Sequence, residues 1–151
     1  MAIKELGHVV LYVRSVERSR HFYGDILGFH QIGPSYRGSS AAAFNSGGRT
    51  HHELLLIEVG EDATPIPEGR RVGMYHFGLK VGETDDELRE VLANLVANDV
   101  QIMGASDHTV THSLYVLDPD GNEIELYIDV QPPIWKEQPE AVLARTKPLR
   151  I

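Results

Sequence analysis

The chain has 151 residues, 42% of them apolar, and a formal net charge of -8 at pH 7. This apolar content suffices for a folded core, while the negative charge argues against binding to nucleic acid or to an anionic membrane surface. There is no cysteine, which excludes disulfides and thiolate ligands, so any metal must be held by His, Asp or Glu.

The first half of the chain predicts a strand, a helix and then three strands. Residues 6–13 form a strand-like run that begins near His8. Ser15 is the expected N-cap of a helix that runs to about residue 27, and Gly28 is the expected stop. The remaining segments of this half are a loop at residues 33–40 and strands at residues 29–32, 41–44 and 51–59.

The second half predicts the same order of elements. A strand is expected at residues 74–81, followed by a helix to about residue 98. Thr84 and Glu87 have the spacing of a capping box, which indicates where this helix begins. The remaining segments are strands at residues 100–103, 114–117 and 123–128, with a hairpin turn at residues 118–122.

The two halves therefore read as a structural repeat in which His8 and His76 open equivalent strands, 68 residues apart. We expect a single α+β domain, with module one at about residues 5–60 and module two at about 72–130. A linker at residues 60–71 joins them. Residues 131–151 form a tail with four prolines and the only tryptophan, and a short helix is expected at 139–144.

Three residues at comparable strand positions, His8, His76 and Glu125, are candidate metal ligands. One such histidine alone would be interpreted as a solvent-facing strand residue. Three of them on a duplicated scaffold favour a metal site, because two imidazoles and one carboxylate hold non-haem Fe(II) and leave positions open. Manganese, nickel and zinc are the alternative metals for such nitrogen and oxygen ligands.

Three further residues could act beside such a metal. His52 begins the fourth strand of module one and could accept and donate a proton near pH 7. His108 lies in a polar loop, and Tyr115 lies ten residues before Glu125 on the partner strand of the hairpin. Taken singly, they could equally be a solvated strand start, an exposed loop histidine and a core tyrosine. The histidines without a pattern are expected on the surface or in helices: His21, His30 and His112.

The motifs taken together resemble the vicinal oxygen chelate superfamily, which includes glyoxalases, extradiol dioxygenases and bleomycin-resistance proteins. The resemblance covers residues 5–130 and is carried by Gly7-His8-Val-Val-Leu-Tyr, by Tyr75-His76-Phe-Gly and by Asp118-Pro-Asp-Gly-Asn-Glu-Ile-Glu125. It implies a fold of two tandem βαβββ modules whose curved mixed sheet encloses a cavity. It also implies a homodimer or a higher homo-oligomer.

The segments around His51-His52 and from Asp107 to Tyr115 resemble those of single-domain type I extradiol catechol dioxygenases. This resemblance implies Fe(II) on His8, His76 and Glu125, with a catechol-type diol and O₂ as substrates. It assigns acid–base catalysis to His52, and substrate contacts to His52, His108 and Tyr115. A cytoplasmic location is expected, because no signal peptide or membrane-spanning run is visible.

Two other functions remain open at this stage. A glyoxalase-like lyase or isomerase would need a fourth ligand from the strand at residues 51–59, and Glu53 could supply it. In a regular strand Glu53 and His52 alternate, so only one of them would point inward. The other alternative is a metal-free protein that sequesters a drug.

Overall fold

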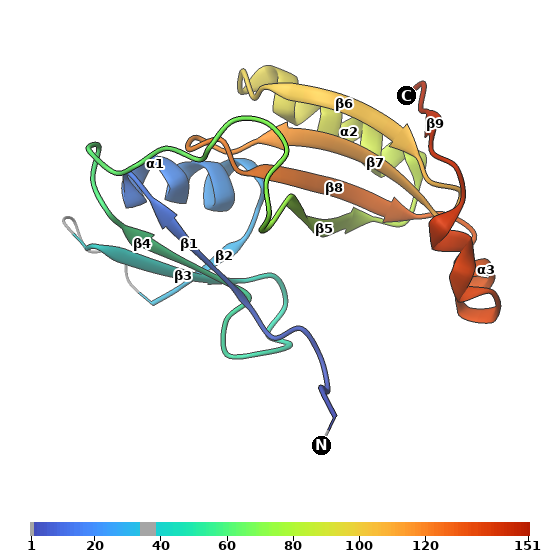
Figure 1. Ribbon diagram of the computed structural model, residues 1–151, viewed down its shortest axis with the longest axis horizontal. Coiled ribbons are helices and arrows are strands. Elements are labelled where there is room, and N and C mark those ends of the chain that lie inside the picture. Colours follow the sequence, from blue (N-terminus) through green and yellow to red (C-terminus); the bar gives the residue numbers. More distant parts are fainter. Residues whose placement is uncertain (1, 34–38) are drawn as a thin grey trace. The chain divides into compact units, whose positions relative to one another are not determined.

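The computed structural model describes residues 2–33 and 39–151, which divide into two compact units, Met1–Ile66 and Pro67–Ile151. Each unit contains one mixed sheet with a helix packed on one face (Figure 1). The boundary falls inside the linker predicted at residues 60–71. The loop predicted at residues 33–40 lies for the most part outside the described residues.

Unit 1 is the first βαβββ module. Its sheet has the order β1-β4-β3-β2, in which β1 runs parallel to β4 and the other pairs are antiparallel. The elements are β1 (Val9–Val13), α1 (Val16–Arg20), η1 (His21–Ile26), β2 (His30–Ile32), β3 (Ala41–Asn45) and β4 (Leu54–Glu58). β1 and β4 are shorter at their N-terminal ends than predicted. His8 and His52 therefore lie just before their strands.

The helix of unit 1 begins and ends where the sequence predicts. The Ser15 side chain accepts a hydrogen bond from the Arg18 backbone N–H, and Gly28 adopts a φ of 82°. Glycine tolerates this left-handed conformation without the steric cost of a side chain. Between these points the chain differs from one uniform α-helix, because residues His21–Ile26 form a π-helical segment that carries the buried Phe22 and Tyr23.

Unit 2 repeats the topology, with β5 parallel to β8, and adds an edge strand from the tail in the order β5-β8-β7-β6-β9. Its helix begins with the predicted capping box, in which Thr84 and Glu87 bind each other's backbone N–H groups. The elements are β5 (His76–Gly82), α2 (Asp85–Ala97), β6 (Ile102–Asp107), β7 (Thr111–Leu117), β8 (Glu123–Asp129), α3 (Pro132–Glu137), η2 (Pro139–Leu143) and β9 (Lys147–Pro148).

The alternation of β8 separates the core of unit 2 from its open face. Ile124, Leu126 and Ile128 have no exposed surface and lie on the face that packs against α2. Each such side chain stabilises the fold by roughly 1.5–3 kcal/mol. Glu123 and Glu125 point to the opposite face, where they remain partly accessible. A one-residue slip of β8 would move these carboxylates into the core, so the register is strongly specified.

The tail has more structure than the sequence predicts. The expected short helix is present as η2, but the preceding α3 and the edge strand β9 were missed. α3 begins after Gln131, which has a left-handed φ of 52°. Lys147 and Pro148 pair with Asp107 and Ser106 of β6, so the tail returns to the sheet. Among the described residues, no helix combines the length and the apolarity needed to cross a membrane.

Candidate active site

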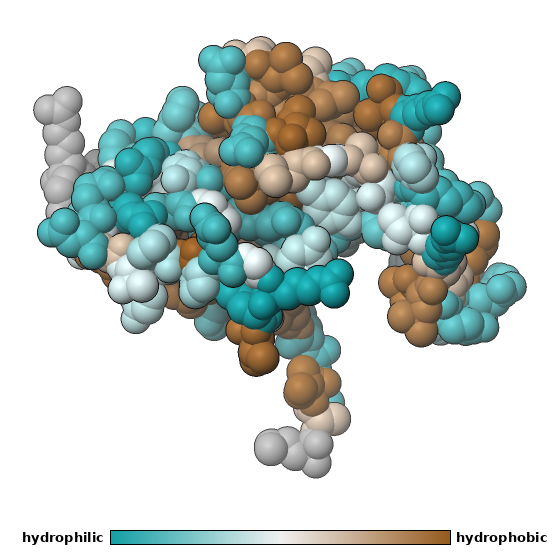
Figure 2. Space-filling view, turned by 45° about the horizontal axis from the view of Figure 1, so that its top comes forward, coloured by the Kyte–Doolittle hydropathy of each residue, from teal (hydrophilic) through white to brown (hydrophobic). Residues whose placement is uncertain are grey.

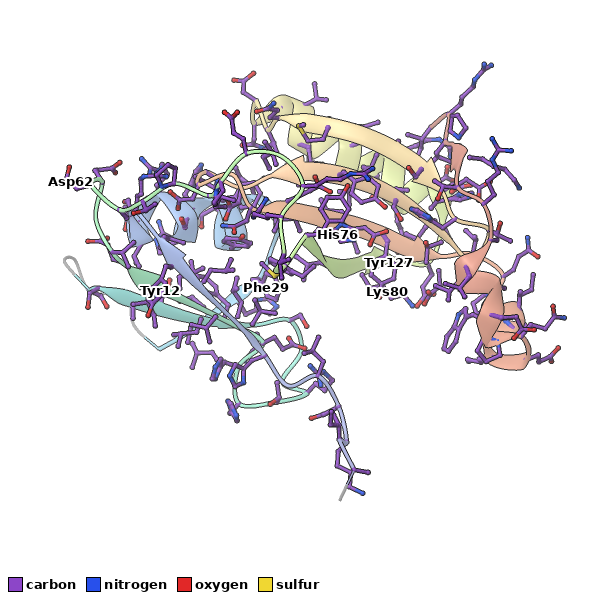
Figure 3. The ribbon with its side chains drawn as sticks, viewed as in Figure 1. Tyr12, Phe29, Asp62, His76, Lys80 and Tyr127 are labelled. Atoms are coloured by element: carbon purple, nitrogen blue, oxygen red, sulfur yellow. The ribbon has the colours of Figure 1, made fainter. Side chains whose placement is uncertain are left out.

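The open face of the unit 2 sheet brings together four of the predicted site residues. β5 and β8 run in parallel, with Gly78 paired to Glu125, while β7 and β8 form the predicted hairpin with Tyr115 paired to Glu125. Figure 3 shows His76 on β5, with Tyr127 and Lys80 farther along the β5–β8 pair. Asp118 stabilises the hairpin turn by accepting from the backbone N–H groups of Asp120 and Asn122.

His76 lies between two carboxylates. Its Nε2 is 3.3 Å from Oε2 of Glu125, and its Nδ1 is 3.5 Å from Oε1 of Glu123. Nδ1 is buried and has no hydrogen-bond partner. The neighbouring Gly78 keeps this space open, because a Cβ there would lie 3.5 Å from Glu125 Oε2 and 3.2 Å from the Tyr127 ring.

A directed chain of hydrogen bonds continues from Glu125. The Tyr115 hydroxyl lies 3.2 Å from Glu125 Oε1, His108 Nε2 lies 2.7 Å from that hydroxyl, and Thr146 Oγ1 lies 3.2 Å from His108 Nδ1. An ionised carboxylate only accepts, so Tyr115 donates to Glu125. His108 Nε2–H then donates to the Tyr115 oxygen, and His108 Nδ1 accepts from Thr146.

The Tyr115 phenol is held in its protonated form. Burial raises its pKa well above the usual range, and the nearby carboxylate of Glu125 raises it further. Because a phenolate beside Glu125 would bring two negative charges together, the hydroxyl remains a donor near neutral pH. Its one proton is donated to Glu125 in this arrangement.

These residues line one cavity of about 470 Å³ within unit 2. That volume lies in the range of small-molecule sites. The sheet side is polar and the tail side is apolar. The polar lining residues are His76, His108, Thr111, Tyr115, Glu125, Tyr127 and Asp129, and the apolar ones are Val110, Trp135, Pro139 and Val142. Four of the polar residues were predicted from the sequence, namely His76, His108, Tyr115 and Glu125, whereas the contribution of the tail was not.

Unit 1 contains a cluster of three histidines, His8, His51 and His52. Each offers one ligand nitrogen, and the three nitrogens lie within 4.8 Å of one another. The rings of His8 and His52 are 4.5 Å apart, and Nδ1 of His51 is 2.6 Å from Nδ1 of His52. No role for His51 was predicted from the sequence. The signal that could have indicated one is the adjacent pair of histidines at the start of a strand.

His52 has the properties of a neutral base. Partial burial lowers its pKa, and the neighbouring imidazoles of His51 and His8 lower it further, because a second positive charge among them is unfavourable. Its Nε2 is buried without a hydrogen-bond partner, while Nδ1 is bound to His51. In the tautomer whose Nδ1–H donates to His51, Nε2 of His52 is unprotonated and can accept a proton or bind a metal.

Glu53 is committed to a loop rather than to the histidine cluster. Its carboxylate accepts from the Ser46 backbone N–H at 2.7 Å, from the Ser46 hydroxyl at 2.5 Å and from Arg49 Nε at 3.2 Å. These bonds, the Ser46 hydroxyl first, lower the pKa of Glu53. Both His52 and Glu53 precede β4, although the Glu53 backbone still binds Phe44 of β3 and Val9 of β1. The Glu53 carboxylate is already occupied by three donors.

Comparison with known proteins identifies the family. The model of the Glyoxalase/Bleomycin resistance protein/Dioxygenase superfamily matches residues 5–126. The chain belongs to this superfamily. The resemblance inferred from the sequence is thereby confirmed, as is the α+β fold of two βαβββ modules. A crystal structure of a glyoxalase/dioxygenase from Nostoc punctiforme has the same fold, with a TM-score of 0.72 over 85% of this chain and 92% of that one, at 24% identity.

Among curated proteins, the chain is 36% identical over 135 residues to a catechol-2,3-dioxygenase of Bacillus subtilis. It is 30% identical over 128 residues to a biphenyl-2,3-diol 1,2-dioxygenase of Rhodococcus globerulus. These matches cover 89% and 85% of this chain but 45% and 64% of the relatives. The metallothiol transferase FosB of Staphylococcus epidermidis is 28% identical, with 83% of this chain and 84% of that protein covered.

The donors in both units fit a divalent metal. In unit 2 Nε2 of the His76 imidazole lies 3.3 Å from a carboxylate oxygen of Glu125. In unit 1 the three imidazoles offer only nitrogen ligands. Imidazole suits iron, nickel, zinc and copper, and carboxylate suits harder cations. This donor chemistry agrees with the metal dependence of the superfamily and leaves the identity of the metal open.

Proposed function

We propose that the protein is an extradiol dioxygenase that inserts both atoms of O₂ into a catechol-type substrate at an Fe(II) centre. The observation that carries this proposal is the hydrogen-bonded chain of Glu125, Tyr115 and His108 along one cavity. A cleavage reaction on a diol needs donors for the ring oxygens, whereas the lyase alternative requires no role for Tyr115 or His108. The similarity to two diol dioxygenases supports the same conclusion.

The proposed Fe(II) ligands are His8, His76 and Glu125. Bound there, the iron would supply electron transfer and a template that orients the diol and O₂. The set matches the two-histidine, one-carboxylate preference of non-haem iron. Manganese, nickel and zinc remain the alternative metals.

The side chains around the substrate have distinct tasks. His52 accepts the proton of a catechol hydroxyl at its free Nε2 and later returns a proton to the reacting oxygen. Tyr115, kept protonated, turns its hydroxyl from Glu125 and donates a hydrogen bond to a ring oxygen as that oxygen gains negative charge. His108 orients Tyr115 and contacts the substrate from the tail side. The apolar side chains of the tail offer a contact surface for the ring.

The direct test uses protein purified without oxygen and loaded with Fe(II). Mixed with a panel of catechols and O₂, it should form yellow ring-cleavage products, and the His52→Ala variant should keep its iron but lose turnover. The His30→Gln variant, which alters an exposed histidine on β2, is the matched control. Absence of ring cleavage across the panel would overturn the proposal.

One observation favours a second candidate, a glyoxalase-like lyase or a transferase. The match to FosB covers 84% of that protein, whereas the match to the catechol dioxygenase covers 45% of the latter. Metal analysis of protein purified without chelators separates the candidates. Iron supports the dioxygenase, nickel or zinc supports the lyase, and no metal supports a drug-binding protein. The cytoplasmic location and the homodimer stay predictions.

A further inference from the structure

The tail of the chain forms the wall of the cavity opposite the predicted ligands. Trp135 of α3, Pro139 and Val142 of η2 line it, facing a sheet surface that carries His76 and Glu125. The match to the family model ends at residue 126, so this wall lies outside the matched residues. Figure 2 shows apolar side chains of the tail at the right of the view.

Contacts within unit 2 hold this wall in place. The edge strand β9 pairs with β6, and the Thr146 hydroxyl binds His108, whose ring also contacts Tyr115. The Lys136 ammonium lies 5.3 Å from the centre of the Trp135 ring, a cation–π arrangement that orients the indole. The tail is therefore connected to the polar part of the cavity through His108.

The charges that line the cavity are of one sign. Among the described residues that form its walls there is no lysine or arginine, while Glu125 and Asp129 contribute carboxylates. Asp129 forms an ion pair with Lys80 at 2.8 Å, and Lys80 also binds Glu83 at 2.6 Å. A further carboxylate brought by a substrate would find no lysine or arginine among these lining residues and would instead face Glu125 and Asp129, which is unfavourable because like charges repel.

We propose that the tail, residues 132–143, selects the substrate: it accepts diols with a neutral apolar ring substituent and rejects those with a carboxylate. The substituent lies against Trp135 and Val142 while the two oxygens point toward the sheet. The choice of diols as ligands rests on the proposed function, whereas the polarity of the wall does not.

The test compares a methylcatechol with the dihydroxybenzoate that carries a carboxylate in place of the methyl group. Trp135 is the only tryptophan, so its fluorescence reports binding directly, in anaerobic protein and without turnover. We expect the methylcatechol to change this emission and to bind on the order of tenfold or more tightly than the benzoate, a difference of about 1.4 kcal/mol.

Two charge variants make the test specific. Val142→Arg places a cation in the wall and should improve binding and kcat/KM for the benzoate by about tenfold, because a charged pair then forms. Leu143→Arg adds the same charge one residue away, at a side chain that is 85% exposed and outside the lining, and should change neither. Val142 is itself 61% exposed, so the arginine is compatible with folding.

The outcomes separate the two proposals. If the methylcatechol changes the Trp135 emission but no catechol is cleaved, the selective wall stands and the dioxygenase proposal fails. If catechols are cleaved while the emission is unchanged, or the benzoate is preferred, the wall does not select the substrate. The selection is also overturned if both arginine variants behave alike.

Discussion

The two units have the same order of strands and helix, yet they hold their functional side chains differently. In unit 2, His76, Tyr115 and Glu125 lie within paired strands, and the strand register sets their spacing. In unit 1, His8 and His52 lie just outside β1 and β4, where no ladder positions them. Unit 2 therefore offers a preorganised network, while unit 1 offers a histidine cluster whose geometry depends on loop contacts.

The largest effect is expected at the centre of the unit 2 network. Glu125→Gln removes the carboxylate next to His76 and should lower both bound iron and turnover by more than a hundredfold. Loss of a residue that only hydrogen-bonds to a metal ligand typically lowers metal affinity or activity by roughly 10–100-fold. Glu123→Gln, which alters the contacts of Glu123 with His76 Nδ1 and with Tyr75, should remain within that smaller range. Iron content and kcat/KM measure both. Equal effects of the two variants would contradict the assignment of Glu125 as the ligand.

Tyr115→Phe should have the next largest effect. It removes a hydroxyl that donates within the cavity, and loss of such a donor costs about 10²–10³ in kcat. Iron content should be unchanged, which distinguishes a substrate contact from a ligand. Tyr127→Phe alters another tyrosine in the lining and is the control. A Tyr115 variant with wild-type kcat would show that the hydroxyl has only a structural role.

A smaller effect is expected in unit 1. His51→Gln removes the imidazole next to Nδ1 of His52 and should lower kcat by roughly tenfold. Losses of this size are typical when a residue that orients a functional side chain by a hydrogen bond is replaced. Iron should remain bound, because His51 is outside the proposed ligand set. Loss of iron would instead indicate that the histidine cluster of unit 1 holds the metal. His21→Gln, which changes an exposed histidine bound to Asp25, is the control.

The smallest effects are expected from substitutions at the N-terminal ends of the two helices, α2 and α1. Thr84→Ala breaks a full capping box and should lower the melting temperature by roughly 2–4 °C. Ser15→Ala removes a single 3.3 Å hydrogen bond from a five-residue helix and should lower the melting temperature by less. Hydrogen bonds from the Glu83 and Thr84 backbone and from the Thr84 hydroxyl lower the pKa of Glu87 below its ordinary 4.5.

The sign of the pH dependence follows from that lowered pKa. The contribution of ionised Glu87 is complete above pH 4.5 and is lost as the pH falls through its folded pKa. The difference in melting temperature between Thr84→Ala and the wild type should therefore shrink in acid. Thermal melts at neutral pH and at low pH measure it. A difference that grows in acid would show that Glu87 does not support the cap.

Much of the fold could be predicted from local patterns. The capping box at Thr84 and the stop at Gly28 are found where they were expected, because each depends on a few neighbouring residues. The hairpin turn before Glu125 likewise sets the pairing register of β7 and β8, in which Tyr115 lies opposite Glu125. The alternation of apolar and polar residues along β8 agrees with this register. The ends of β1 and β4 were predicted too early, since strand ends depend on the pairing of distant segments.

By itself, the sequence determined which side chains share the open face of unit 2. Successive side chains of a strand point to opposite faces of the sheet, and the pairing register then places residues of the adjacent strands beside them. It also determined the family, since its motifs cover most of the chain. Only the tertiary structure decided that Glu53 serves a loop, that His51 joins His8 and His52, and that Trp135 of the tail lines the cavity. Those placements arise from contacts between segments outside regular strands, where no local period constrains a side chain.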